Sequence, residues 1–290
     1  MAIIADSRTR LLVQGITGHQ GRFHAQAMRA FGTEVVAGVT PGKGGQEVNG
    51  IPVHESVREA TKAIDANTSV VFVPASSAKE AVMEAIDGGL KTVIVISERI
   101  PIHDSLDMIE YGKLKSARII GPNCPGVTSP GVAKVGIMPN DIFLRGRTGV
   151  VSRSGTLTYE VVNDLTQAGI GQSTCVGIGG DPIVGCSFTE VLELFQSDPE
   201  TERIVLIGEI GGTAEEDAAE FVQENMTKPV VGFVAGQTAP KGKRMGHAGA
   251  IIAGGKGTAA EKIEAFKVAG IRIAETPAVI GQRMAEALAT

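Results

Sequence analysis

The chain has few aromatic residues and few cysteines, and each shortage excludes a class of protein. Aromatic residues make up 4% of its 290 positions, and tryptophan is absent. Its cores must therefore be aliphatic, as in α/β folds that bind phosphates on their loops. The three cysteines, Cys124, Cys175 and Cys186, are an odd set without metal-ligand spacing. A disulfide framework and a cysteine metal site are thus disfavoured, and no metal ligands are assigned.

Excess positive charge and long apolar runs are missing as well. The net charge of -5 leaves no broad basic surface, so binding to nucleic acid is not expected. Basic side chains gather only locally, at Lys43 and around Lys241–Arg244, which suits small anionic ligands. No stretch is apolar enough to span a membrane, and no signal-peptide pattern opens the chain. We therefore expect a soluble cytoplasmic protein.

Short β-branched runs alternate with helical patterns along the whole chain, which predicts two α/β domains with parallel sheets. The first half has strands expected at 11–14, 34–39, 70–73, 93–96 and 118–120, and helices at 20–31, 55–64, 78–87 and 104–115. The second half has strands expected at 149–151, 174–178, 204–207, 230–234 and 271–274, and helices at 155–168, 188–196, 214–225, 258–269 and 278–288. Turn formers cluster from Gly121 to Gly131, so we place a connecting segment at 123–148 between domains at 1–122 and 149–290.

The first glycine motif, Gly15-Ile-Thr-Gly-His-Gln-Gly21, lies between the first expected strand and helix. Such a turn lets a phosphate rest on a helix N-terminus. An NAD site would also need an acidic residue at the end of the second strand, to bind the ribose. That strand ends instead in Val39-Thr-Pro-Gly-Lys-Gly-Gly45. A multiply phosphorylated ligand such as coenzyme A is therefore favoured over NAD, and a structural turn with a solvated lysine is the alternative.

His247 lies among glycines and basic residues in the segment 241–258, the setting of a phosphoryl-accepting imidazole. The alternative for this segment is a glycine-rich surface loop with a solvated histidine. Glu209 follows a buried strand and could fix the tautomer of an imidazole. Ser154, Gly155 and Thr156 open a helix, either as an anion seat or as an ordinary N-cap.

Two near-matches to the phosphate-binding P-loop, at 236–244 and 249–257, have one residue too many and lack the final Ser or Thr. Neither would form the Walker cradle. Any nucleoside triphosphate is therefore expected to bind on another chain.

Together these motifs resemble the α subunits of succinate–CoA ligases (succinyl-CoA synthetases) over essentially the whole chain. The matching segments are 15–21, 39–45, 121–126, 152–159, 177–182, 208–212 and the His247 segment. The resemblance implies an N-terminal Rossmann-like CoA-binding domain followed by a flavodoxin-like ligase domain. It also implies an ATP-grasp β subunit that carries ATP or GTP and Mg²⁺, with succinate, CoA and phosphate as small-molecule substrates.

The resemblance further assigns roles to individual residues. His247 is implied as the phosphorylated residue and Glu209 as the residue that orients it. Ser154, Gly155 and Thr156 are implied as a phosphate seat, and Tyr159 as part of the substrate site. Residues implied in CoA binding are Thr17, Gly18, His19, Gln20, Lys43, Ile96, Ser97, Glu98, Cys124 and Pro125. His19 departs from the family pattern, which often has a small residue at this position.

Three other functions remain open at the level of sequence. A related enzyme such as a malate–CoA ligase α subunit would use the same chemistry on another acid. A non-catalytic CoA-binding module would need neither the second domain nor His247. An NAD-dependent oxidoreductase lacks the ribose-binding acid.

Overall fold

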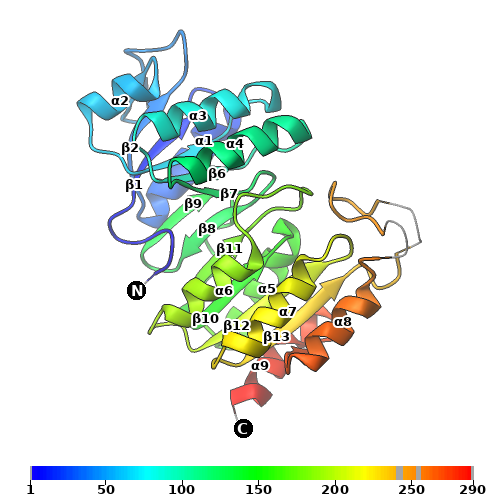
Figure 1. The fold of residues 1–290 in the computed structure, drawn as a ribbon. Helices are drawn as coiled ribbons and strands as arrows, with labels where there is room; N and C mark the ends of the chain where they lie inside the picture. The colour runs from blue at the N-terminus through cyan, green and yellow to red at the C-terminus, as the bar shows by residue number, and fades with distance from the viewer. Residues whose placement is uncertain (1, 240–243, 253–255, 289–290) are drawn as a thin grey trace. The chain divides into compact units, whose positions relative to one another are not determined.

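A computed structural model describes residues 2–239, 244–252 and 256–288. The chain divides into two compact units (Figure 1). The N-terminal unit comprises residues 4–140 with 183–185, and the C-terminal unit comprises residues 1–3, 141–182 and 186–290. None of the described helices is long and apolar enough to cross a membrane.

The N-terminal unit has a seven-stranded sheet in the order β3-β4-β2-β1-β5-β6-β7. Only the β3–β4 pair is antiparallel. The strands are β1 (Arg10–Gln14), β2 (Glu34–Val39), β3 (Glu47–Val48), β4 (Ile51–His54), β5 (Thr68–Val71), β6 (Thr92–Val95) and β7 (Arg118–Ile120). Without the short β3, this is the classic Rossmann strand order, with its switch point between β1 and β5. The expected Rossmann-like fold is confirmed.

Helices cover both faces of this sheet. Neighbouring helices α2 (Val57–Ala63), α3 (Ala78–Asp87) and α4 (Ile102–Leu114) pack on one face. Helix α1 (His19–Phe31) packs against β1 and β2, and beside it lies a hairpin of β8 (Gly126–Ser129) and β9 (Ala133–Gly136). α1 buries Gly21, Ala25 and Met28, which are spaced for one helical face, and it ends at Gly32, whose φ of 108° suits glycine.

The C-terminal unit has five parallel strands in the order β14-β13-β12-β10-β11. They are β10 (Arg145–Ser152), β11 (Gln172–Gly177), β12 (Arg203–Glu209), β13 (Val230–Ala235) and β14 (Arg272–Ile273). Counted along the chain, this is the flavodoxin-like order 2-1-3-4-5, with its switch point between β10 and β12. The flavodoxin-like fold expected for the second domain is confirmed too.

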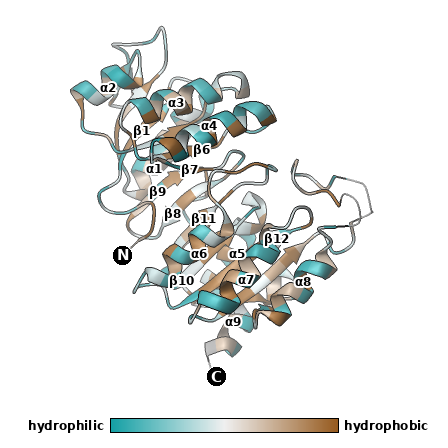
Figure 2. Cartoon of the chain, in the orientation of Figure 1, coloured by the Kyte–Doolittle hydropathy of each residue, from teal (hydrophilic) through white to brown (hydrophobic). Residues whose placement is uncertain are grey.

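Helices α6 (Phe188–Ser197), α7 (Ala214–Asn225) and α8 (Ala259–Val268) lie side by side on one face of this sheet. Helices α5 (Gly155–Gln167) and α9 (Ile280–Leu288) pack together on the other face. Figure 2 shows hydrophilic colour on the outer faces of α7 and α8 and hydrophobic colour along the strands. Two of the few aromatic rings pack directly against glycines of the sheet: Phe195 packs over Gly149, and Phe266 packs over Gly232.

The structure contains strands that were not expected in two regions. The segment 123–148, expected as a connection, carries β8, β9 and the start of β10. β8 and β9 are four residues each and flank the turn at Ser129-Pro-Gly131, and the turn formers around them predicted a connection instead of strands. Strands β3 and β4 were also not anticipated, since Pro52 within β4 argues against a strand interior.

Candidate functional site

His247 and Glu209 meet at the carboxyl edge of the C-terminal sheet. Glu209 is the last residue of β12, which lies next to β10 at the switch point. The Nδ1 atom of His247 lies 2.8 Å from Oε2 of Glu209. A carboxylate only accepts hydrogen bonds, so Nδ1 donates, and in the neutral ring Nε2 then keeps its lone pair. The tautomer expected for a nucleophilic imidazole is the one that this geometry selects.

The pKa of His247 is raised above its ordinary value. The chief cause is the hydrogen bond to Glu209, and burial acts in the opposite direction. The charges of Glu209 and Asp181 also raise this pKa, whereas the charge of Arg153 lowers it. The imidazole is half-buried, with 26% of its side chain exposed, while Glu209 is 7% exposed. The surrounding charges and hydrogen bond therefore favour the protonated form of His247.

Glycines let the backbone come close to the imidazole ring. A Cβ atom on Gly180 would lie 2.3 Å from Cγ of His247, and one on Gly211 would lie 2.1 Å from the carbonyl oxygen of Gly249. The Gly249 amide donates to the Gly180 carbonyl at 3.1 Å. No larger residue fits at Gly180 or Gly211 without moving the His247 segment.

Of the basic residues expected around His247, Lys241 and Lys243 lie outside the described residues. Arg244 is exposed, and its backbone pairs with that of Ile251 across the segment. The positive charge that the structure does place near His247 comes from Arg153, directly after β10. Arg153 lies in the matching segment 152–159, but no role was expected for it.

Residues 154–156 open α5, next to Arg153. The Ser154 hydroxyl accepts a hydrogen bond from the Leu157 amide at 3.3 Å, so Ser154 is an N-cap. The first turn of α5 has no acidic residue, which leaves its positive end uncompensated by a carboxylate. Thr156 is exposed and Tyr159 is half-buried. Ser154 can cap α5 while the start of the helix binds an anion, since free N–H groups remain there.

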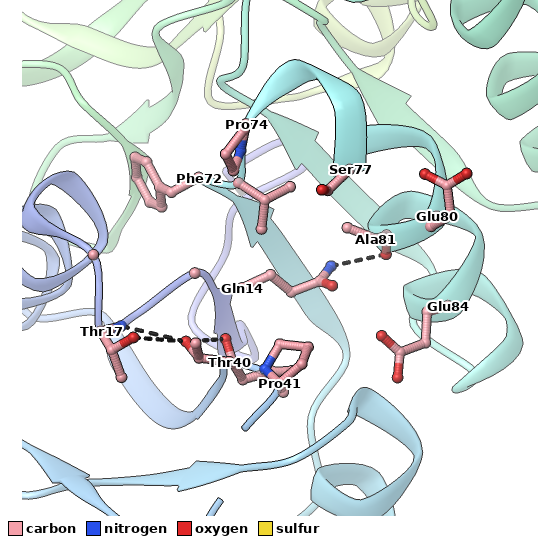
Figure 3. A pocket seen from close by; sticks show the side chains of 14 residues that line it. Gln14, Thr17, Thr40, Pro41, Phe72, Pro74, Ser77, Glu80, Ala81 and Glu84 are labelled. Carbon is pink, nitrogen blue, oxygen red and sulfur yellow. Dashed lines mark hydrogen bonds between the residues drawn. The ribbon is translucent and has the colours of Figure 1, made fainter. Parts of the chain in front are cut away.

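The N-terminal unit has a cavity of about 640 Å³ at its own switch point, between the ends of β1 and β5 (Figure 3). It is lined by Gln14, Gly15, Thr17, Gly18, Val39, Thr40, Pro41, Phe72, Val73, Pro74, Ser77, Glu80, Ala81 and Glu84. Among the lining residues, the hydroxyls of Thr17 and Thr40 lie 3.2 Å apart. Glutamates Glu80 and Glu84 on α3 bring negative charge to the far wall.

Glycines in the turn before α1 leave room for another group to come close to the backbone. Gly18 is the N-cap of α1 and offers no side-chain cap, and the first turn has no acidic residue. A Cβ on Gly21 would lie 2.2 Å from the Gly15 carbonyl oxygen, so only glycine fits there. The amides at the start of α1 are therefore available to an anion.

The other residues predicted to bind CoA are spread around this edge. His19 lines a second, smaller hollow with Arg22 and Asn49, and Gln20 is exposed. Lys43 is exposed on the loop after β2, whose Gly42 and Gly44 amides donate to the Glu55 carboxylate. These hydrogen bonds lower the pKa of Glu55. None of His19, Gln20 and Lys43 is among the lining residues of the 640 Å³ cavity.

Ile96, Ser97 and Glu98 follow β6, one strand beyond the switch point, and the Ser97 hydroxyl donates to the Val73 carbonyl. Cys124 is buried, and its Sγ lies 3.3 Å from the Val95 carbonyl oxygen. Burial raises the pKa of this thiol to about 12. Cys124 is therefore a packing group in this structure rather than a reactive thiolate, and Pro125 is buried beside it.

Among the residues that the structure describes, no group of three or more His, Cys, Asp or Glu side chains could hold a metal ion. The three cysteines are buried, and none of them forms a disulfide.

Comparisons with known proteins match the two halves of the chain to two families. A CoA binding domain family matches residues 6–99, and a CoA-ligase family matches residues 151–272. The succinate–CoA ligase [ADP-forming] subunit alpha 2 of Archaeoglobus fulgidus is 59% identical, over 99% of this chain and 100% of its own. The corresponding α subunit of Aquifex aeolicus is 56% identical, over 99% of this chain and 95% of its own.

A solved structure is similar over the same length. ATP citrate lyase of Methanosaeta concilii, in complex with (3S)-citryl-CoA, superposes with a TM-score of 0.91 at 26% identity. The match covers 98% of this chain and 50% of the lyase, so the chain spans about half of that protein. The resemblance seen in the motifs is thus confirmed over the full length, and the chain belongs to the family of succinate–CoA ligase α subunits.

Proposed function

We propose that this chain is the α subunit of a succinate–CoA ligase that acts through a phosphohistidine at His247. In the overall reaction, succinate, CoA and a nucleoside triphosphate give succinyl-CoA, the nucleoside diphosphate and phosphate. The phosphoryl group passes first to His247 and then to a succinate carboxylate. The CoA thiolate then attacks the acyl carbon of succinyl phosphate, and phosphate leaves.

The hydrogen bond between His247 and Glu209 carries this proposal. With Nδ1 donating to Glu209, Nε2 has a lone pair that can attack phosphorus in line with the departing diphosphate. As the N–P bond forms, the ring becomes cationic, and the adjacent carboxylate stabilises that charge. The glycines around the ring give backbone N–H groups room to approach a phosphoryl group.

CoA fits the N-terminal unit. The cavity of about 640 Å³ is lined mostly by apolar surface, apart from polar groups such as Glu80 and Glu84, and it borders the start of α1, where uncapped amides suit a phosphate. Thr17, Gly18, His19 and Gln20 would surround the phosphates there, with Lys43 adding positive charge from its exposed loop. We propose that Ile96–Glu98 and the backbone of Cys124 and Pro125 lie along the remainder of CoA.

The nucleotide is proposed to bind on a partner. Both near-matches to the P-loop include residues outside the described ranges, and their sequences lack the Walker pattern. The curated relatives are named as α subunits of ADP-forming ligases. We therefore propose an ATP-grasp β subunit that binds ATP and Mg²⁺ and delivers the phosphoryl group to His247. Ser154–Thr156 would seat that group at the start of α5, and Tyr159 would contact succinate.

The test uses the chain purified together with its β subunit. We expect steady-state conversion of ATP to ADP to require both succinate and CoA, and succinyl-CoA to accumulate at the same rate as ADP. A panel of dicarboxylic acids, including malate, measures acid specificity by kcat/KM. Preference for malate would reassign the acid, and absence of any CoA-dependent reaction with every acid would refute the proposed function.

Gly180→Ala tests the close packing on His247. The new methyl group would overlap Cγ of the imidazole, so the ring must shift away from its hydrogen bond to Glu209. We expect phosphorylation of His247 by ATP to slow by about tenfold, because small misplacements of a reacting group are costly. Rapid-quench phosphorylation measures the rate, and CoA binding by calorimetry serves as the control and stays unchanged. A wild-type rate would show that Gly180 does not constrain the ring.

A further inference from the structure

The side chain of Arg153 joins two buried glutamates at the switch point of the C-terminal unit. Its Nε lies 3.4 Å from Oε1 of Glu209, and its Nη1 lies 3.3 Å from Oε1 of Glu215. Nη1 also donates to the Gly211 carbonyl at 3.1 Å. The side chain is 8% exposed. A planar guanidinium can serve three acceptors in different directions, which the single ammonium of lysine does less well.

A second buried ion pair supports the arrangement of Arg153 and the two glutamates. Glu215 on α7 and Lys262 on α8 are both fully buried, and their side chains form an ion pair at 2.5 Å. Lys262 also pairs with Glu216 at 2.8 Å and donates to the Gly212 carbonyl at 3.0 Å. Glu215 in turn accepts a hydrogen bond from the Glu209 amide at 3.0 Å. Charges thus alternate in sign from Lys262 through Glu215 and Arg153 to Glu209, and end at His247.

Glu209 has one oxygen that the hydrogen bonds leave unused. Oε2 accepts from His247, whereas the buried Oε1 has no hydrogen-bond partner among the described residues. A buried carboxylate oxygen without a partner is costly, so its position needs an explanation. Arg153 is the one Lys or Arg of the described residues that forms an ion pair with Glu209. Its charge therefore offsets that of Glu209 and limits rotation of the carboxylate.

We propose that Arg153 is a positioning residue: it holds Glu209 against Nδ1 of His247 and opposes protonation of the imidazole. The inference rests on the proposed phosphohistidine. Glu209 and Asp181 attract a proton to the ring and Arg153 repels it. The further charged groups packed behind are Glu215, Glu216 and Lys262. Without Arg153, Glu209 would be an uncompensated buried anion, and the ring would hold its proton more tightly.

The test compares Arg153→Gln with Arg153→Lys in the complex with the β subunit. Single-turnover phosphorylation by labelled ATP is followed across the pH range in which histidine titrates. For Arg153→Gln we expect the acid limb of the profile to move up by about one pH unit, because a nearby cation is lost. For Arg153→Lys we expect the limb to stay in place, because the charge remains, and the plateau to fall by about tenfold, because Glu209 and the imidazole are positioned less well. Arg147→Gln, which removes an exposed arginine–glutamate pair from β10, is the matched control and changes neither.

An unmoved acid limb in Arg153→Gln would overturn the inference. If Arg153→Gln does not assemble, Arg153→Lys decides: an unreduced plateau contradicts the positioning role, and a reduced plateau with an unmoved limb supports it. The rate at which diethyl pyrocarbonate modifies His247, followed against pH by peptide mass, reports the same protonation without phosphoryl transfer. A wild-type complex that takes no label would refute the proposed function, whereas a variant effect missing from a labelled wild type would refute only the role of Arg153.

Discussion

His247→Asn is expected to abolish succinyl-CoA synthesis and the acid-labile phosphoenzyme. Asparagine keeps a polar side chain beside Glu209 but has no nitrogen lone pair that can attack phosphorus. We expect the rate to fall by at least about four orders of magnitude, as for loss of a covalent nucleophile. The measurement is formation of succinyl-CoA and of labelled protein by the complex with its β subunit.

His103→Asn is the control for this change, because His103 is an exposed histidine on α4. It is expected to retain full activity and label. Assembly with the β subunit and CoA affinity should be the same in both variants. Labelled protein in the His247→Asn variant would show that another residue accepts the phosphoryl group.

Glu209→Gln is expected to slow phosphorylation of His247 by about a hundredfold, since it keeps the shape of the side chain and removes its charge. A glutamine can also turn its amide N–H towards Nδ1, which would place the proton on Nε2 and block attack. The rate of label incorporation in the complex measures the effect. A wild-type rate would contradict the orienting role of Glu209.

The same variant is also expected to shift the pH dependence of His247 phosphorylation in a definite direction. The hydrogen bond to Glu209 is the chief cause of the raised pKa of His247. In Glu209→Gln the pKa should fall, so the acid limb of phosphorylation moves to lower pH, opposite to the shift expected for Arg153→Gln.

The pair of His247 and Glu209 should also make folding stability depend on pH. Because the pKa of His247 in the folded state lies above its value in the unfolded state, the pair stabilises the fold fully below the unfolded pKa. This stabilisation is lost as pH rises through the folded pKa. Urea unfolding of both proteins at several pH values should show that difference, and a pH-independent difference would contradict it.

The regular parts of the fold could be predicted from sequence because their patterns are long. Strand Glu34–Val39 and helices Ala78–Asp87 and Ala214–Asn225 have the predicted bounds. The strands β3, β8 and β9 could not, since they lie among glycines and prolines that predict turns rather than strands. Their pairing depends on neighbours that lie apart in sequence, such as Lys134 on β9 and Thr33, whose hydroxyl donates to the Lys134 carbonyl.

Some residues of the candidate site could likewise be predicted from sequence, and others could not. His247 and Glu209 stand out in sequence because glycine-rich turns surround reactive side chains, and the structure brings them together. Arg153 and Lys262 do not stand out, since a charged residue is ordinarily expected at the surface. Lys262 is fully buried only because α7 presents Glu215 and Glu216 beside it, a contact between helices that no local pattern encodes.

The central claim is that His247 carries the phosphoryl group between the nucleotide and succinate. The most direct measurement treats the purified complex with ATP and Mg²⁺, digests it at neutral pH, and locates phosphate by peptide mass. We predict one acid-labile phosphate on the peptide that contains His247, and its complete discharge when succinate and CoA are added. Formation of succinyl-CoA with no phosphate on that peptide, or with stable phosphate elsewhere, would contradict the account.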